Sequence, residues 1–212
     1  MKYIFYDLCG ANICMFIKIY TIFNTWYFNY IFKIIAIVCS VYTFAIIYTI
    51  TATYNLFFLK RNNHTFLQLF HSFVEVGFIY SCIFFSYLIM KLSFFMQRPC
   101  CNENFSNLIT QKADLNFASI NCFASFPSAH TGMAVLISYI FLKYRNGGIL
   151  SKLLLFFLII LTGISRITLA MHYPIDVIYS IAIAWAICVL ADKIINTQYV
   201  KNNITQYIGK KI

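Results

Sequence analysis

The stretch LSKLLLFFLIILTGISRIT, at residues 150–168, decides the class of fold. A helix needs about 20 mostly apolar residues to cross the roughly 30 Å of hydrocarbon in a bilayer. This stretch approaches that length and carries its only two charges near its ends. The whole chain has the same character, since 61% of its 212 residues are hydrophobic and only 10% are charged. Soluble domains carry about 45–50% apolar and about 25% charged residues. The composition therefore excludes an ordinary soluble globule and predicts an integral membrane protein.

Four further stretches have the length and hydropathy of a span. Together with the first, their approximate limits are 34–58, 72–90, 129–146, 150–168 and 174–194. A sixth candidate lies within residues 8–32, where Lys18 separates two apolar stretches. This segment either crosses the membrane or lies in the interface as a helix rich in Tyr and Trp. We expect an all-α, polytopic transmembrane helix bundle of five or six spans. Residues 1–33 then form an N-terminal span or interfacial helix, and residues 34–212 form the membrane domain.

The distribution of positive charge predicts the orientation of this bundle. Sixteen Lys and Arg against six Asp and Glu give a net charge of +10. In a membrane protein such a surplus reports topology and contact with anionic lipid, so we expect no nucleic-acid partner. Nine cations fall in connections on one side, namely Lys60, Arg61, Lys143, Arg145, Lys152, Lys193, Lys201, Lys210 and Lys211. Because Lys and Arg accumulate in cytoplasmic loops, the connection at about 91–128 and the turn at 166–173 are expected to face the exterior.

Three segments place unusual polar residues on this outer side. They are KLSFFMQRP at residues 91–99, PSAH at 127–130 and SRITLAMHYPID at 165–176. Together they contain all three prolines of the chain and two of its four histidines, and each stands at the boundary of a predicted span. We take this boundary as the candidate functional site.

The first two segments have the spacing of an anion-binding site. Lys91 and Arg98 are seven residues apart, which puts them on one face of a continuing helix and about 10 Å apart along its axis. Their long side chains can converge on one anion, and Pro99 then ends the helix. Ser128 opens the next span at an N-cap position, where free backbone N–H groups can bind a phosphate. His130 is expected beside that anion.

The third segment has the spacing of an activated histidine. His172 and Asp176 are four residues apart, or about one helical turn. The carboxylate can then hold one imidazole nitrogen and leave the other free for nucleophilic attack. Arg166, six residues before His172, adds a further cation.

In this order and spacing, the three segments resemble the signature motifs of the type 2 phosphatidic acid phosphatase superfamily. The resemblance covers residues 91–176, and the one departure is Ala129, where the usual second motif has glycine. A left-handed backbone would strain an alanine there, whereas a right-handed helical one would not. The resemblance implies that His172 is the nucleophile, Asp176 its orienting partner and His130 the general acid. The groups that it implies for the phosphoryl oxygens are Lys91, Arg98, Ser128, Arg166 and the backbone N–H of Ala129.

The resemblance also implies a metal-independent lipid phosphatase in a bacterial inner membrane, with no cofactor and with its site facing the periplasm or exterior. Phosphoryl transfer needs mainly positioning and neutralisation of charge, and three cations meet that need. Small bacterial members act on lipid A, undecaprenyl pyrophosphate, phosphatidylglycerophosphate or phosphatidate, and we expect lipid A narrowly ahead of the others. Phosphotransfer to an acceptor lipid uses the same chemistry. The alternative of another class is a non-enzymatic transporter or scaffold, which the retention of His130, His172 and Asp176 disfavours.

Two other groups of residues have more ordinary interpretations. An acid within a span is a functional candidate by default, but Glu75 lies sixteen residues before Lys91, about 24 Å along a helix. We therefore expect a structural or snorkelling role near the cytoplasmic interface. Most of the eight cysteines are scattered through apolar stretches. In the outer loop, an oxidising compartment permits Cys122 to form a disulfide with Cys100 or Cys101.

Overall fold

The computed structural model describes residues 10–58, 63–105, 107–109, 121–145 and 147–197. Within these ranges the chain forms helices and no named strand, as expected for an all-α bundle. The helices are α2 (Ala11–Phe23), α3 (Trp26–Val38), α4 (Val41–Phe58), α5 (Asn63–Ser93), α6 (Ala129–Arg145), α7 (Ile149–Thr168) and α8 (Pro174–Ile195). Two short 3₁₀ helices, η1 (Pro99–Cys101) and η2 (Glu103–Phe105), follow α5. Lys60, Arg61, Lys201, Lys210 and Lys211, on which the predicted orientation partly rests, lie outside the described residues.

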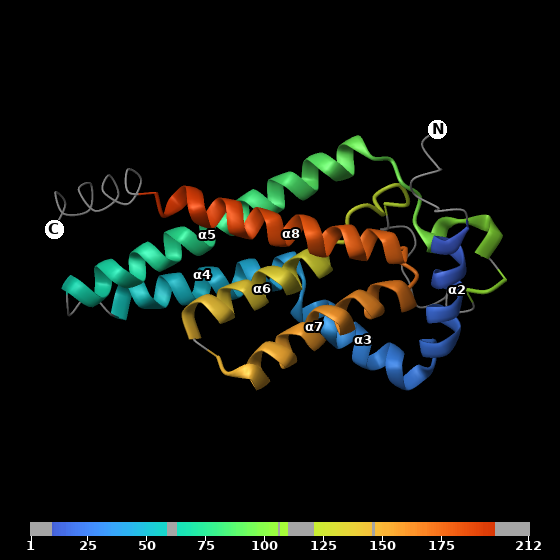
Figure 1. Cartoon of the computed structure of the whole chain (residues 1–212), viewed down its shortest axis with the longest axis horizontal. Coiled ribbons are helices and arrows are strands. Elements are labelled where there is room, and N and C mark those ends of the chain that lie inside the picture. Colours follow the sequence, from blue (N-terminus) through green and yellow to red (C-terminus); the bar gives the residue numbers. More distant parts are fainter. Residues whose placement is uncertain (1–9, 59–62, 106, 110–120, 146, 198–212) are drawn as a thin grey trace.

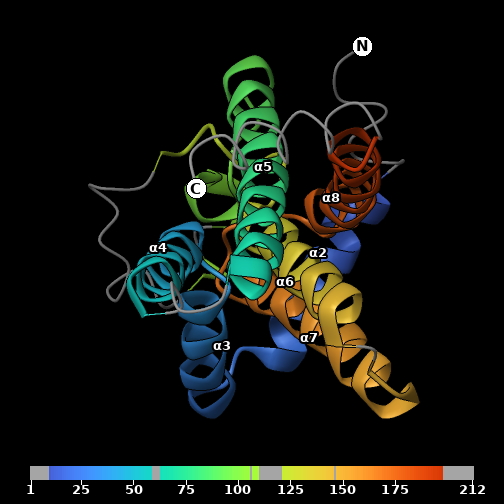
Figure 2. The ribbon, with the colours of Figure 1, turned by 90° about the vertical axis from the view of Figure 1, so that its left-hand side faces the viewer.

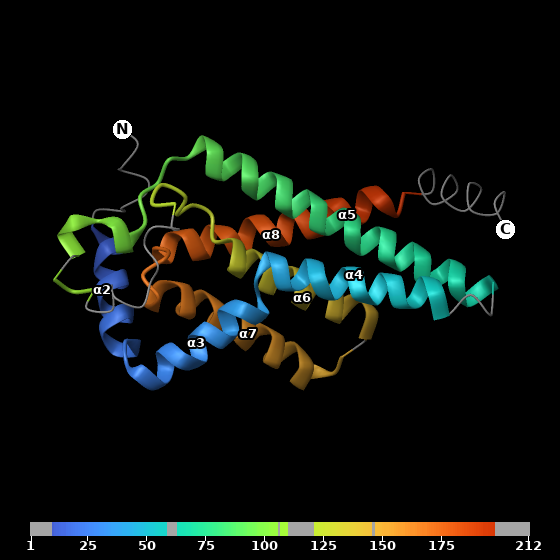
Figure 3. The same ribbon diagram turned by 180° about the vertical axis from the view of Figure 1, so that it is seen from behind.

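Helices α5 to α8 run alternately up and down the long axis of the molecule (Figures 1 and 3). Helix α6 packs mainly against α7 and α8, and α5 packs along α8. Seen from the end in Figure 2, α4 and α5 lie on one side of α6, and α7 lies on its other side. As a result, the end of α5, the start of α6, the end of α7 and the start of α8 all face the same end of the bundle. The three predicted motifs occupy these four helix termini and the loops between them.

Three described helices are long and apolar enough to cross a membrane, namely Leu69–Ser93 within α5, and α7 and α8. A fourth span results if α3 and α4 are taken together, although the two helices are bent by 46° at their junction. Helix α6, with 17 residues, and α2, with 13, are shorter. The predicted limits of the last three spans lie within one residue of α6, α7 and α8, whereas α5 begins nine residues before the span predicted at 72–90. The predicted number of five or six spans is not confirmed.

The N-terminal part differs from the sequence expectation in where its helices break. Lys18 lies inside α2, and the chain breaks instead at Asn24 and Thr25 and again at Cys39 and Ser40. The second break has a clear cause, because the Ser40 hydroxyl accepts the backbone N–H of Thr43 at 3.0 Å and caps α4. The stretch predicted as one span at 34–58 is therefore parts of two helices.

Helix α2 lies across the end of the bundle that carries the motifs (Figure 1). Its 13 residues extend about 20 Å, which is less than the thickness of the hydrocarbon core. Phe16 and Tyr20 on its inner face are buried against Tyr173 and Phe105, close to the third motif. Of the two expectations for this segment, the position of α2 favours a helix lying in the interface.

At the opposite end of the bundle a partly buried network of polar side chains joins α5, α6 and α8. Lys143 of α6 forms ion pairs with Glu75 of α5 and Asp192 of α8. The Tyr144 hydroxyl donates to Glu75 at 2.7 Å and the Tyr139 hydroxyl donates to Asp192 at 2.7 Å. Glu75 is only 3% exposed, so these contacts compensate for its burial. This arrangement is a structural one, linking three helices at the end remote from the motifs.

Replacing Lys143 with Met is expected to lower the free energy of unfolding by roughly 2–3 kcal/mol, because it leaves the buried Glu75 carboxylate without its cation. The measurement is the thermal unfolding midpoint of detergent-purified protein. The double variant Glu75→Gln/Lys143→Met should recover part of the loss, since the amide no longer buries a charge. A double variant that is less stable than Lys143→Met alone would contradict this account.

Candidate active site

Hydrogen bonds to backbone carbonyls hold the three motifs together. The Arg98 N–H donates to the carbonyl of Cys122 at 2.8 Å, and the Lys91 ammonium donates to the carbonyl of Ala124 at 2.9 Å. These bonds join the first motif to the segment that precedes the second. The Cys100 N–H donates to the carbonyl of Ala170 at 2.9 Å and joins the first motif to the third. Three stretches distant in sequence thus form one structural unit.

A disulfide adds a covalent link within this unit. Cys101 and Cys122 are bonded, with 5.7 Å between their Cα atoms. The sequence left Cys100 and Cys101 as alternatives, and the structure selects Cys101. The bond attaches the chain just after Arg98 to the chain just before Ser128, so two groups expected to bind the same phosphate are held on a common support.

A tight reversal after α7 positions the third motif. Ala170 has a φ of 52°, the left-handed conformation that a side chain disfavours. The reversal lets the carbonyl of Arg166 accept the N–H groups of both Met171 and His172, at 3.0 and 3.2 Å. His172 is thereby directed inward and is 2% exposed. A strained residue next to a buried histidine is a feature typical of functional sites.

The carbonyl of Ser125 orients the imidazole of His172, and Asp176 acts on the imidazole through Ser125. Its Nδ1 lies 2.5 Å from the carbonyl oxygen of Ser125 and 3.7 Å from Oδ2 of Asp176. A carbonyl oxygen can only accept, so Nδ1 carries the hydrogen and the lone pair is on Nε2. Asp176 accepts instead from the Ser125 hydroxyl at 2.6 Å and from the Tyr173 N–H at 2.9 Å. The carboxylate therefore fixes Ser125, and the carbonyl of Ser125 fixes His172.

The sequence analysis missed Ser125. It lies three residues before Ser128 and is fully buried, but the atom that contacts His172 belongs to its backbone. Every residue type has a backbone carbonyl, so the amino-acid type does not reveal such a contact. The only available signal was its closeness to the PSAH motif.

The second motif begins α6. Ser128 directly precedes the helix and its carbonyl accepts the N–H of Gly132 at 3.0 Å, the first bond of α6. The Ser128 hydroxyl pairs with that of Thr131 at 2.9 Å. Ala129 is the first helical residue and is not among the described residues with left-handed φ, so alanine is accommodated there without strain. His130 follows in the first turn, within electrostatic range of Lys91, Arg98, Arg166 and His172.

Arg166 provides the clearest sign of an anion-binding site. It is 8% exposed, and its Nε is buried without a hydrogen-bond partner in the part of the chain that the structure describes. A buried polar group without a partner is costly, and a charged guanidinium is more so.

All eight side chains or backbone groups predicted for the site gather at one end of the bundle, and Arg166 has a donor available there. Their roles in catalysis stay predictions.

Burial, reinforced by the charges of Lys91, Arg98 and Arg166, holds the pKa of His172 well below its ordinary value. The hydrogen bond to Ser125 opposes this effect without overcoming it. The imidazole is therefore neutral at pH 7, which is the form that a nucleophile requires.

Within the described ranges, no group of three or more His, Cys, Asp or Glu side chains is arranged to hold a metal ion.

The fold and the site define an all-helical membrane bundle with a cluster of cations and histidines at one end, of which Arg166 and His172 are buried. The chain belongs to the PAP2 superfamily, whose family model matches residues 72–199, more than half of its length. This match confirms the resemblance to the type 2 phosphatidic acid phosphatases.

Two individual proteins are similar to this chain. The undecaprenyl-diphosphatase BcrC of Bacillus subtilis (strain 168) is 41% identical over 99 residues, which are 47% of this chain and 45% of that protein. The aligned stretch thus spans less than half the length of the relative. The crystal structure of Aquifex aeolicus LpxE matches with a TM-score of 0.61 over 86% of this chain and 95% of that one, at 19% identity. At that identity the similarity concerns the fold alone.

Replacing Ser125 with Ala is expected to lower kcat about tenfold, because Asp176 loses a charge-assisted hydrogen bond of ~1.5 kcal/mol and the loop that orients His172 loosens. Ser125→Thr keeps the hydroxyl and should retain most of the activity. The measurement is the steady-state rate of phosphate release together with KM. Equal activity of the Ala and Thr variants would show that the hydroxyl has no such role.

The acid limb of kcat/KM is expected to have its midpoint below pH 6.5, after allowance for the separately measured ionisation of the substrate. The reason is that kcat/KM reports the free enzyme, in which the lowered pKa of His172 delays its protonation as the pH falls. Arg98→Gln removes one nearby cation and should move the midpoint to higher pH. A wild-type midpoint at or above 6.5 would contradict the assignment.

Proposed function

We propose that this protein is a membrane lipid phosphatase that binds the phosphate of a lipid headgroup at the end of the bundle carrying the motifs. The observation that carries the proposal is the buried Nε of Arg166, which has no partner among the described residues. The oxygens of a phosphoryl group, like those of a carboxylate, match the donors of a guanidinium. Lys91 and Arg98 supply two further cations close to His172.

The reaction proposed here has two steps. In the first, Nε2 of His172 attacks the phosphorus, and His130 donates a proton to the leaving oxygen. In the second, water attacks the phosphohistidine, with His130 now taking its proton, and inorganic phosphate leaves. Lys91, Arg98, Arg166, Ser128 and the N–H of Ala129 bind the phosphoryl oxygens, whose charge must be neutralised in the transition state. Because these groups supply that neutralisation, we propose that the reaction needs no metal.

For the substrate we propose a polyprenyl diphosphate. The support is BcrC, which is named an undecaprenyl-diphosphatase and is 41% identical over a stretch of 99 residues. The sequence alone favoured lipid A narrowly, and a lipid A phosphate is the competing candidate in any assay. The remaining alternatives are phosphatidylglycerophosphate and phosphatidate, and transfer of the phosphoryl group to an acceptor lipid. We further propose a multi-pass position in a bacterial inner membrane, with the site on the periplasmic or outer side.

His172→Ala is expected to abolish release of phosphate, because no other group at the site is placed to form the covalent intermediate. His130→Ala should lower the rate by about 10²–10⁴ on an alkyl phosphate. The loss should be smaller on a diphosphate, whose phosphate leaving group needs less protonation. The measurement is release of ³²P-phosphate, with acid-free quenching to detect label on the protein.

The controls separate this proposal from its alternatives. A chelator should leave the rate unchanged, and vanadate should inhibit. Label appearing in an acceptor lipid instead of inorganic phosphate would identify a phosphotransferase. Full activity of His172→Ala, or no activity of the wild type on any lipid phosphate, would refute the proposed function.

A further inference from the structure

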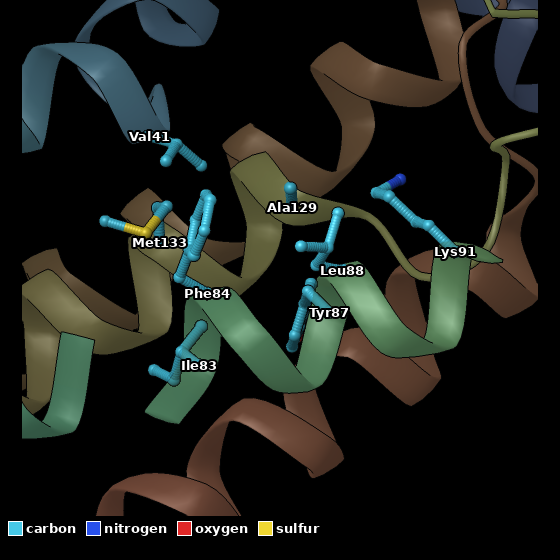
Figure 4. Close-up of a pocket in the computed structure, with 8 residues that line it drawn as sticks. All are labelled: Val41, Ile83, Phe84, Tyr87, Leu88, Lys91, Ala129 and Met133. Carbon is cyan, nitrogen blue, oxygen red and sulfur yellow. The ribbon is translucent and has the colours of Figure 1, made fainter. Parts of the chain in front are cut away.

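An apolar groove lies between α4, α5 and α6, next to the candidate site. Helix α5 lines it with five residues, namely Ile83, Phe84, Tyr87, Leu88 and Lys91. The other sides are formed by Val41 of α4 and by Ala129 and Met133 of α6. Figure 4 shows Lys91 at one end of the groove and Val41 and Met133 at the other.

The groove shares two residues with the phosphate site. Lys91 borders it with its aliphatic stem, while the ammonium donates to the carbonyl of Ala124 in the loop of the second motif. Ala129 borders it with its methyl group, and the backbone N–H of the same residue is at the start of α6. A ligand whose phosphate is bound at Lys91 would therefore have the groove directly beside it.

The remaining walls offer no polar atom to a ligand. Tyr87 is the one other lining residue with a polar group, and its hydroxyl is bonded to the carbonyl and hydroxyl of Ser180 on α8, at 2.8 and 2.7 Å. Phe84 and Leu88 are 41% and 42% exposed, so the groove is open at the outer surface of the bundle. In a membrane that surface faces lipid, and a hydrocarbon chain can enter from the side.

We infer that this groove, the α5–α6 groove, binds the hydrocarbon chain of the substrate next to its phosphate, and that it selects a single chain attached directly to that phosphate. The inference rests on the proposed function. Beside Lys91 the walls are Leu88 and the methyl of Ala129, which cannot hydrogen-bond a sugar or the ester groups of a glycerolipid. A polyprenyl phosphate or diphosphate has carbon at that position. From Ile83 to Lys91 the groove measures about 12 Å along α5, so it holds only the first part of a long chain.

The test fills the groove from its open side. Leu88→Trp places an indole in the groove. Ile89→Trp, at the next position on α5, is the control: it points the same side chain outward, because Ile89 is 61% exposed and does not line the groove. Both are compared with the wild type on undecaprenyl diphosphate in mixed micelles and on p-nitrophenyl phosphate, which has no chain. Phe84→Ala, which widens the groove, is the second groove variant.

Leu88→Trp is expected to raise KM for undecaprenyl diphosphate about tenfold, equivalent to ~1.4 kcal/mol, with kcat nearly unchanged. Phe84→Ala should raise the same KM less. Activity on p-nitrophenyl phosphate should change by less than twofold in both, and Ile89→Trp should behave as the wild type. The inference is overturned if Leu88→Trp affects both substrates equally, if it affects neither, or if Ile89→Trp has the same effect. It is also overturned if phosphatidate or a lipid A phosphate is hydrolysed faster than the polyprenyl substrate.

A binding measurement separates this inference from the proposed function. In the His172→Ala variant, a polyprenyl phosphate with a photoreactive group on its first isoprene unit should crosslink to residues 83–88 of α5 or to Met133. Leu88→Trp in the same background should reduce that crosslink. Crosslinking with no turnover by the wild type would refute the phosphatase and leave the groove. Turnover by the wild type with crosslinks only elsewhere would refute the groove and leave the phosphatase.

Discussion

Carbonyl oxygens of the segment at residues 121–125 make the contacts on which the whole site depends. They accept hydrogen bonds from the backbone and side chain of Arg98, from the ammonium of Lys91 and from the imidazole of His172. Several cations close together repel one another, and burial makes that repulsion stronger. Carbonyl dipoles offset part of it without removing positive charge. The segment can do this because it is held between two anchors, the Cys101–Cys122 disulfide and the start of α6.

This arrangement leaves the site incomplete in a way that suits an anion. Lys91 and Arg98 are held by carbonyls, yet the Nε of Arg166 has no partner among the described residues. A phosphate would satisfy that donor and reduce the mutual repulsion of the three cations. The folded protein therefore holds the cations together before the ligand binds, at a cost in stability that the ligand then offsets. The same preorganisation is what makes electrostatic stabilisation of a transition state effective. The same cations, which we propose bind phosphate, also hold the pKa of His172 low, so the proposed nucleophile stays neutral.

The sequence predicted those parts of the structure that depend on side-chain type and spacing. Limits of the later spans follow from hydropathy, and the residues of the site follow from three motifs of fixed spacing. What the sequence could not give depends on backbone atoms and on three-dimensional packing. Ser125 acts on His172 through its carbonyl, and the break before α4 results from one serine hydroxyl among many similar residues. Glu75 could be assigned a structural role, but its partners Lys143 and Tyr144 lie about seventy residues away on another helix.

Polar contacts fix α5 at three points along its length and limit how far the helix can move. Glu75, twelve residues after the first residue of α5, is bonded to Lys143 of α6 and to Asn196, the residue that follows α8. Near the C-terminal end of α5, Lys91 is bonded to the loop before α6, and about one turn earlier the Tyr87 hydroxyl is bonded to Ser180 of α8. A helix held at three points against two neighbours cannot slide or tilt freely, so the apolar groove beside Phe84 and Leu88 keeps its width and its distance from Lys91. In a bilayer, hydrophobic contact alone would not secure such a groove, since lipid and protein hydrocarbon are nearly equivalent. The polar bonds of α5 therefore give the groove a fixed shape, and a fixed shape is what selection among lipid chains requires.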